Sequence, residues 1–162
     1  MIAADILAVA RARGIRIATA ESCTGGMIAA ALTDIAGSSD VFDRGFVTYS
    51  NDAKIAMLGV QQTTLTAHGA VSEQIAAEMA AGAITSAYTT LAHATLAVAT
   101  TGIAGPGGSD FKPEGRVCFG LAQIGHPTQT CTIEFGPLGR AAVRAAATEY
   151  ALGLLSHALD PA

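Results

Sequence analysis

A strand-like run that leads through a glycine-rich polar turn into a helical pattern is the feature that most constrains this chain. Residues 15–19 are mostly apolar, residues 20–26 carry a glutamate, three nucleophilic side chains and two glycines, and residues 27–32 are apolar again. A strand that passes directly into a helix is the building unit of α/β folds. The unpaired N–H groups at such a helix start attract anions, and glycines let a ligand approach the backbone. The turn is therefore the first candidate for a functional site.

Helical and strand-like patterns alternate along the rest of the chain. Helices are predicted over residues 5–12, 25–36, 51–58, 63–68, 73–88 and 138–157, and strands over residues 15–19, 45–49, 95–100, 117–124 and 130–135. Ser50 or Asn51 can cap the third helix, which Gly59 can end, and Ser72 can cap the fifth. This order predicts the α/β class, as a three-layer α/β/α sandwich with a mixed, mostly parallel sheet of about five strands. The absence of repeats and linkers predicts one domain over residues 1–162.

Charge and cysteine content exclude several classes of function. Nine Lys and Arg residues face 13 Asp and Glu residues, a net charge of −4, and the basic residues do not cluster. Nucleic acid and an anionic membrane are therefore not expected as partners. Three cysteines without a CxxC spacing predict neither disulfides nor a metal site, and no cofactor is expected.

Hydropathy bears on location and assembly. No apolar run reaches the ~18 residues that a membrane span needs, and no basic leader precedes an apolar stretch, so the cytoplasm is the expected location. Only 14% of the residues are charged, and Ala and Gly are abundant. This composition favours close packing and a homo-oligomer.

Ser22, Cys23 and Thr24 place three possible nucleophiles in the turn. A hydroxyl at a helix start, such as that of Thr24, is most often a cap, whereas Ser22 lies earlier in the turn. A serine needs a base to remove its proton. None of the four histidines lies in a comparably polar turn, so nothing in the sequence promotes a Ser-His-Asp triad, although one is not excluded.

Lysine is the other base that is paired with serine, and Lys54 lies in the first turn of the helix that follows the second strand. Because the carboxyl ends of neighbouring parallel strands meet at one edge of a sheet, Ser22, Tyr49 and Lys54 are expected to lie together. Partial burial and a helix N-terminus both lower the pKa of a lysine, which can then act as a general base. The alternative is a solvated surface lysine.

A second glycine-rich segment, residues 100–108, follows the most apolar strand. Its N–H groups can bind a phosphate or an oxyanion. It is neither a G-x-G-x-x-G nor a Walker A sequence, so it does not predict a dinucleotide or ATP site. A tight structural connection is the alternative. Arg140, at the start of the last helix, is either a phosphate contact or a solvated residue.

Together these segments resemble the nicotinamide-nucleotide amidohydrolases, also known as the C-terminal domain of the competence/damage-inducible protein CinA. The matching segments are residues 21–26, 45–51, 54, 68–72 and 101–106, and the similarity extends over about residues 3–157. The resemblance implies a small-molecule nucleotide substrate: the carboxamide of nicotinamide mononucleotide is hydrolysed to nicotinate mononucleotide and ammonia. It also implies a serine–lysine mechanism without metal, in pyridine-nucleotide salvage.

Transferred to this chain, the resemblance assigns Ser22 as the nucleophile, Lys54 as the general base and Tyr49 as a hydrogen-bonding assistant. The residues implied to bind the substrate or its oxyanion are Glu21, Thr24, Gly25, Gly26, Thr101, Gly102, Gly105 and Arg140, the last at the phosphate. The helix start after Thr24 is expected to receive the negative charge. Glu21 either orients Lys54 or satisfies the turn.

The chain departs from the family pattern at two places. Residues 112–116 read Lys-Pro-Glu-Gly-Arg where members commonly have Lys-Pro-Val-Gly-Thr, and residues 138–140 read Leu-Gly-Arg instead of Gly-Asp-Arg. Some members also carry a molybdopterin-binding-like domain, and since these 162 residues match only the amidohydrolase part, the stand-alone form is expected. Two alternatives remain open: Cys23 as the nucleophile, and a non-catalytic nucleotide-binding module linked to competence or DNA damage.

Overall fold

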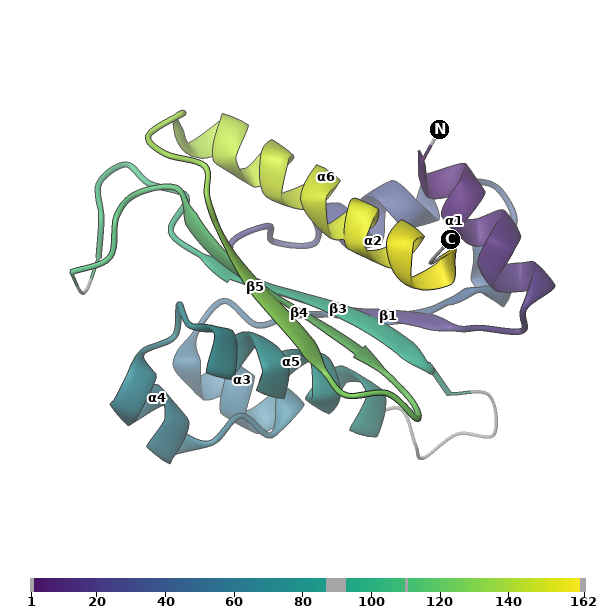
Figure 1. Cartoon of the computed structure of the whole chain (residues 1–162), viewed down its shortest axis with the longest axis horizontal. Coiled ribbons are helices and arrows are strands. Elements are labelled where there is room, and N and C mark those ends of the chain that lie inside the picture. Colours follow the sequence, from purple (N-terminus) through teal and green to yellow (C-terminus); the bar gives the residue numbers. More distant parts are fainter. Residues whose placement is uncertain (1, 87–92, 110, 161–162) are drawn as a thin grey trace.

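The computed structural model describes residues 2–86, 93–109 and 111–160. Their five strands form one mixed sheet in the order β2-β1-β3-β4-β5 (Figure 1). The strands are β1 (Ile17–Glu21), β2 (Phe42–Val47), β3 (Leu96–Gly102), β4 (Arg116–Gln123) and β5 (Gln129–Glu134). β2, β1 and β3 pair in parallel, whereas β4 is antiparallel to both of its neighbours. Four of the five strands therefore run in one direction.

Helices cover both faces of the sheet (Figure 1). One layer contains α1 (Ile2–Ala12), α2 (Met27–Thr33) and α6 (Arg140–Leu159), and the other contains α3 (Asn51–Leu58), α4 (Gln62–His68) and α5 (Glu73–Thr85). Each layer has its own hydrophobic core against the sheet. The predicted three-layer α/β/α sandwich with a mixed sheet is confirmed.

The central strands explain how the two layers fit. Along β1 and β3, Ile17, Leu96 and Val98 face the core under α1, α2 and α6. The opposite face of these strands presents alanines to α5, as at Ala97 and Ala99. Small side chains let α5 approach the sheet closely, and a Cβ on Gly120 would clash with the carbonyl of Ala76. α5 and the sheet therefore pack backbone against backbone at this point.

The predicted caps are present, but most element boundaries differ from the prediction. The first strand, predicted over 15–19, is Ile17–Glu21, so Glu21 ends the strand. Ser50 Oγ accepts from the N–H of Ala53 and Ser72 Oγ from that of Ile75, while Gly59 ends α3 with a φ of 70°. The predicted helix 25–36 is shorter because Gly25 and Gly26 have φ values of 59° and 101°, which a helix does not allow. The predicted strand 45–49 is wrong in its limits, since β2 pairs with β1 from Phe42 onward. The predicted helix end at residue 88 lies outside the described residues.

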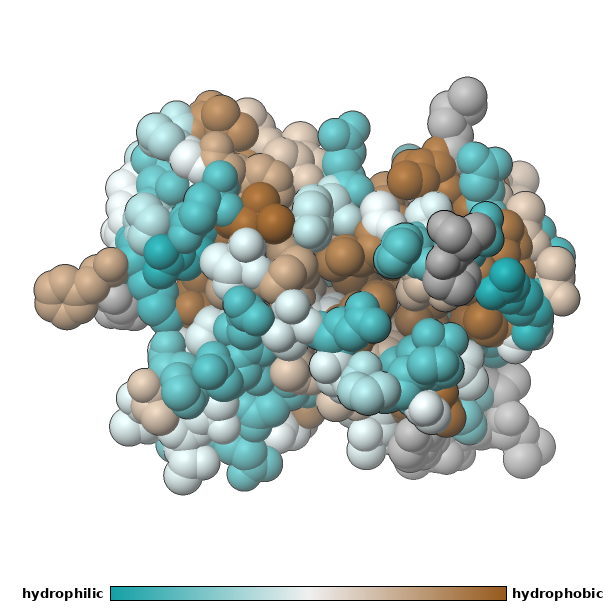
Figure 2. Space-filling view, in the orientation of Figure 1, coloured by the Kyte–Doolittle hydropathy of each residue, from teal (hydrophilic) through white to brown (hydrophobic). Residues whose placement is uncertain are grey.

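The exterior of the protein is largely polar, with hydrophobic residues among the polar ones. Figure 2 shows hydrophilic and hydrophobic residues interspersed, with hydrophobic ones breaking the polar surface along α6. A shallow hollow there is lined by Phe135, Tyr150 and Leu154, among others. In the described part of the chain, no helix has the length and apolar character that a membrane crossing requires.

Candidate active site

Ser22 and Lys54 meet at the carboxyl edge of the sheet. β1 and β2 pair in parallel up to Glu21 and Val47, so the residues that follow, Ser22 and Thr48, lie side by side. α3 then brings Lys54 back over this edge, and its Nζ lies 3.0 Å from Ser22 Oγ. The same Nζ donates to the carbonyl of Thr48 at 3.0 Å. The juxtaposition expected from the strand order is present.

Burial shifts the protonation equilibrium of Lys54 toward the uncharged amine. The residue is only 3% exposed, and desolvation lowers the pKa of its ammonium group. None of the ion pairs formed by the described residues includes Lys54. Nζ donates to Ser22 Oγ in the structure, whereas a neutral amine has a lone pair that can accept the Ser22 hydroxyl proton at the same separation.

Ser22 opens into a cleft with a volume of about 380 Å³. Its walls come from the turn after β1, from Tyr49, from the α4–α5 connection, from the glycine-rich loop and from the start of α6. The lining residues are Ser22, Cys23, Tyr49, Ala70, Val71, Gly102, Ile103, Ala104, Gly105, Pro106, Gly107, Gly108, Ser109, Lys112 and Arg140. The charged members of this described set are both cationic, in a chain of net charge −4. The cleft therefore suits an anionic ligand.

Arg140 joins three segments at the cleft. One guanidinium nitrogen donates to the carbonyl of Gly105 at 2.8 Å, and the other donates to the hydroxyl of Tyr49. Tyr49 is 58% exposed, and its hydroxyl faces Arg140 rather than the Ser22–Lys54 pair. Tyr49 was expected to assist that pair, but in the described structure its hydrogen bond belongs to the wall of the cleft.

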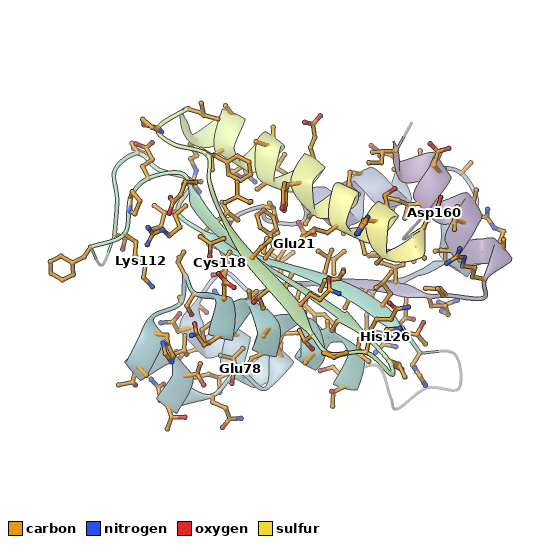
Figure 3. The ribbon with its side chains drawn as sticks, in the orientation of Figure 1. Glu21, Glu78, Lys112, Cys118, His126 and Asp160 are labelled. Atoms are coloured by element: carbon orange, nitrogen blue, oxygen red, sulfur yellow. The ribbon has the colours of Figure 1, made fainter. Side chains whose placement is uncertain are left out.

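Glu21 lies in the interior, under α6 in the view of Figure 3, and is fully buried. Its Oε1 accepts from the Thr24 hydroxyl at 2.7 Å and from the N–H groups of Gly26 and Ile28, while Oε2 accepts from the N–H of Ala29. The N-terminus of α2 is thus occupied by the chain's own carboxylate. The N–H groups at this helix start are therefore taken up by Glu21, and neither Glu21 nor Thr24 lines the cleft, so the substrate contacts expected there stay predictions. Glu21 satisfies the turn and does not orient Lys54.

The glycine-rich loop is also partly structural. The Thr101 hydroxyl donates to the carbonyl of Ala70 at 2.7 Å, and the side chain is buried. The hydroxyl anchors the α4–α5 connection, and Thr101 is not part of the cleft lining. Gly102 and Gly105 line the cleft, whereas Gly25 and Gly26 lie outside its lining. The substrate contacts expected of Thr101 and of these glycines stay predictions.

Two cations that support the site were missed by sequence reasoning. Lys112, labelled in Figure 3, lies on the projecting loop and donates to the carbonyls of His68 and Val71. Arg144 donates to the carbonyls of Cys23 and Thr24. For Arg144 a signal existed, because it follows Arg140 by four residues and so shares its face of the predicted helix. Lys112 reaches 44 residues back along the chain, and no local pattern indicates that.

The competing chemistries find less support. Burial raises the pKa of the Cys23 thiol to about 11, which disfavours a thiolate nucleophile. All four histidines are described, and none lines the cleft. No group of three or more His, Cys, Asp or Glu side chains within the described ranges is arranged to hold a metal ion.

The cap formed by Glu21 gives a first prediction. Glu21→Gln is expected to lower the free energy of unfolding by about 2 kcal/mol, because the amide turns an N–H donor toward a buried backbone N–H. At this chain length the loss corresponds to a fall of roughly 4–8 °C in Tm, measured by thermal unfolding. Glu134→Gln is the control, since that side chain is 50% exposed and pairs only with Arg116 at the surface. Equal losses for both variants would contradict the importance of the buried cap.

The sequence of this chain is similar to those of known proteins. The model of the family described as "CinA C-terminal domain" matches residues 1–159. Nicotinamide-nucleotide amidohydrolase PncC of Escherichia coli strain K12 is 52% identical over 146 residues, which are 90% of this chain and 85% of that protein. A CinA-like protein of Chloroherpeton thalassium is 58% identical over 113 residues, 69% of this chain but 26% of that protein. This chain thus matches about a quarter of the longer relative.

Solved structures agree with the sequence relatives. The crystal structure of the competence/damage inducible protein CihA from Agrobacterium tumefaciens has a TM-score of 0.89 at 49% identity, and the match covers 98% of this chain and 93% of that one. A competence or damage-inducible protein from Enterobacter asburiae has a TM-score of 0.91 at 35% identity, with coverage of 98% and 96%.

Proposed function

The chain belongs to the CinA C-terminal domain family, and on that premise we propose that it hydrolyses the carboxamide of nicotinamide mononucleotide. The products are nicotinate mononucleotide and ammonia. The observation that carries the proposal is the hydrogen bond between Ser22 and the buried Lys54 at the base of a cationic cleft. The relatives named nicotinamide-nucleotide amidohydrolase supply the substrate class.

The proposed reaction has two halves. Neutral Lys54 removes the proton of Ser22 while Oγ attacks the carboxamide carbon, which forms a tetrahedral oxyanion. The C–N bond then breaks while Lys54 gives its proton to the leaving amine. Ammonia departs, and the rest of the substrate stays bound to Ser22 as an ester. Water attacks the ester carbon while Lys54 takes a proton from the water. The bond from the acyl carbon to Ser22 Oγ then breaks, Lys54 returns the proton to Oγ, and the nicotinate nucleotide is released.

The oxyanion needs donors that are not already used. In the turn, the N–H groups of Gly25 and Met27 bond to turn carbonyls, and those of Gly26 and Ile28 bond to Glu21. Cys23 follows the nucleophile directly and lines the cleft. We assign its backbone N–H to the oxyanion, where one such donor contributes about 3–4 kcal/mol in enzymes that use one.

The substrate's phosphate is assigned to Arg140. Its guanidinium lines the cleft and is held by Gly105 and Tyr49, two neutral partners that a dianion can replace with stronger, charge-assisted bonds. Phosphate binding at Arg140, remote from the reacting amide, supplies binding energy that positions the amide for attack. In the cytoplasm, such a reaction returns the pyridine ring to nucleotide synthesis.

An ammonia-release assay with three substrates tests the proposal. Nicotinamide mononucleotide is expected to be hydrolysed with a kcat/KM at least about 10-fold above that of nicotinamide riboside, because a charge-assisted contact contributes about 1.5–3 kcal/mol. NAD is the third substrate. Ammonia release measured with the Ser22→Ala protein is subtracted as the background. Calorimetric binding of the mononucleotide without any ammonia release would reject hydrolysis in favour of a non-catalytic nucleotide-binding module.

A further inference from the structure

Arg144 contacts the nucleophile turn from behind rather than from the cleft. It follows Arg140 by one helical turn on α6, but it does not line the cleft. Its Nε donates to the carbonyl of Cys23 at 3.0 Å, and its Nη2 lies 3.4 Å from the carbonyl of Thr24. These are the two residues that follow Ser22. The contact therefore joins the last described helix to the turn that carries the nucleophile.

The turn supplies partners for two of its three carbonyls. The carbonyl of Ser22 accepts from the N–H of Gly25 at 3.0 Å, and that of Thr24 accepts from the N–H of Met27 at 3.1 Å. For the carbonyl of Cys23, Arg144 is the partner found among the described residues. Cys23 is buried, so this carbonyl has little access to water. Without the guanidinium, this buried carbonyl has no hydrogen-bond partner, which favours a change in the conformation of the turn next to Ser22.

The opposite side of the turn is held by a group of opposite charge. The Glu21 carboxylate bonds the N–H groups of Gly26 and Ile28, whereas the Arg144 guanidinium bonds the carbonyls. Gly25 fits this arrangement: a Cβ there would lie 3.1 Å from Arg144 Nη2, so the guanidinium lies directly on the backbone. The two side chains together leave the turn little freedom to shift.

We propose that Arg144 is a positioning residue, which holds the turn so that Ser22 Oγ stays within hydrogen-bond reach of Lys54 Nζ. The inference rests on the proposed role of Ser22 as nucleophile. A displacement of about 1 Å between reacting groups lowers a rate about 100-fold. A planar guanidinium can reach two carbonyls at once, whereas an ammonium group is a single point donor. Lysine at this position is therefore expected to restore only part of the function.

The experiment compares Arg144→Gln and Arg144→Lys with Arg11→Gln. Arg11 is the matched control because it also donates from a helix to a loop carbonyl, that of Gly37 at 2.8 Å, but lies away from the cleft. With nicotinamide mononucleotide, Arg144→Gln is expected to lower kcat about 100-fold and to leave KM within about 3-fold. Arg144→Lys is expected to fall between wild type and Arg144→Gln, and Arg11→Gln to stay within about 2-fold of wild type.

A second readout is independent of the nucleotide. The rate at which a serine-directed fluorophosphonate labels Ser22 is expected to fall in the same order across the variants. If wild type is labelled at Ser22 but releases no ammonia from nucleotides, the proposed function fails while labelling still tests Arg144. An unchanged kcat and labelling rate in folded Arg144→Gln or Arg144→Lys would overturn the inference. So would a loss confined to Tm, which indicates a purely structural contact.

Discussion

Replacement of Ser22 by alanine is expected to lower kcat for ammonia release from nicotinamide mononucleotide by about 10⁴- to 10⁶-fold. Without Oγ no ester can form, and Lys54 has no hydroxyl to deprotonate. The only hydrogen bond that the Ser22 side chain forms within the described residues is the one to Lys54, and Lys54 keeps its bond to the Thr48 carbonyl. The variant is therefore expected to fold normally. Single-turnover ammonia release and thermal unfolding, measured on the same preparation, check both statements.

Cys23→Ala is the control for this prediction. The adjacent thiol is buried and has a raised pKa, so its removal is expected to change kcat by less than about 3-fold. A Cys23→Ala protein as inactive as Ser22→Ala would instead assign the attack to sulfur. Wild-type turnover by Ser22→Ala would remove Ser22 from the mechanism altogether.

The second large effect is expected at Lys54. Lys54→Met keeps an unbranched side chain of similar length but removes the base, so kcat should fall by about 10²- to 10⁴-fold. Lys54→Arg keeps a cation in place and should be no more active than Lys54→Met, because a guanidinium stays protonated in proteins and cannot act as a base. If Lys54→Arg keeps near-wild-type turnover, the residue acts through its charge and not as a base.

The lowered pKa of Lys54 gives this prediction a pH dependence. Below that pKa the ammonium cannot accept a proton, so kcat/KM should rise with pH through a midpoint below the ordinary value of 10.5 and then level off. Between the lowered pKa and 10.5 the unfolded lysine binds a proton that the folded one has released. Stability of the wild type should therefore increase as pH rises through this window, and Lys54→Met should lose that increase. pH-rate profiles and urea unfolding at several pH values measure the two effects.

Local chemistry made much of this architecture predictable. Ser50 and Ser72 cap helices where the sequence places them, because capping depends on neighbours within three residues. The meeting of Ser22 with Lys54 was also predictable, since parallel strand order alone brings two strand ends to one edge. The homo-oligomer expected from composition stays a prediction.

The remaining features depend on partners far away in the chain. Thr101 was expected in the cleft, but its hydroxyl bonds Ala70, which lies 31 residues earlier. The helical spacing from Arg140 indicates the face on which Arg144 lies, but not that it contacts Cys23, 121 residues earlier. For Glu21 the sequence left two roles open, orienting Lys54 or satisfying the turn, because both place a carboxylate just before a glycine-rich helix start. Only the fold shows that its carboxylate turns inward to the N–H groups.

The position of α6 in the chain has a consequence for how the site matures. Ser22 and Lys54 lie in the first third of the sequence, yet the contacts that brace their surroundings come from Arg140 and Arg144 on the final described helix. α6 also packs against α1, so the two ends of the fold close on each other. During synthesis the proposed nucleophile and base emerge from the ribosome long before the residues that contact their surroundings. The proposed catalytic pair is therefore expected to reach its final geometry only after α6 has docked.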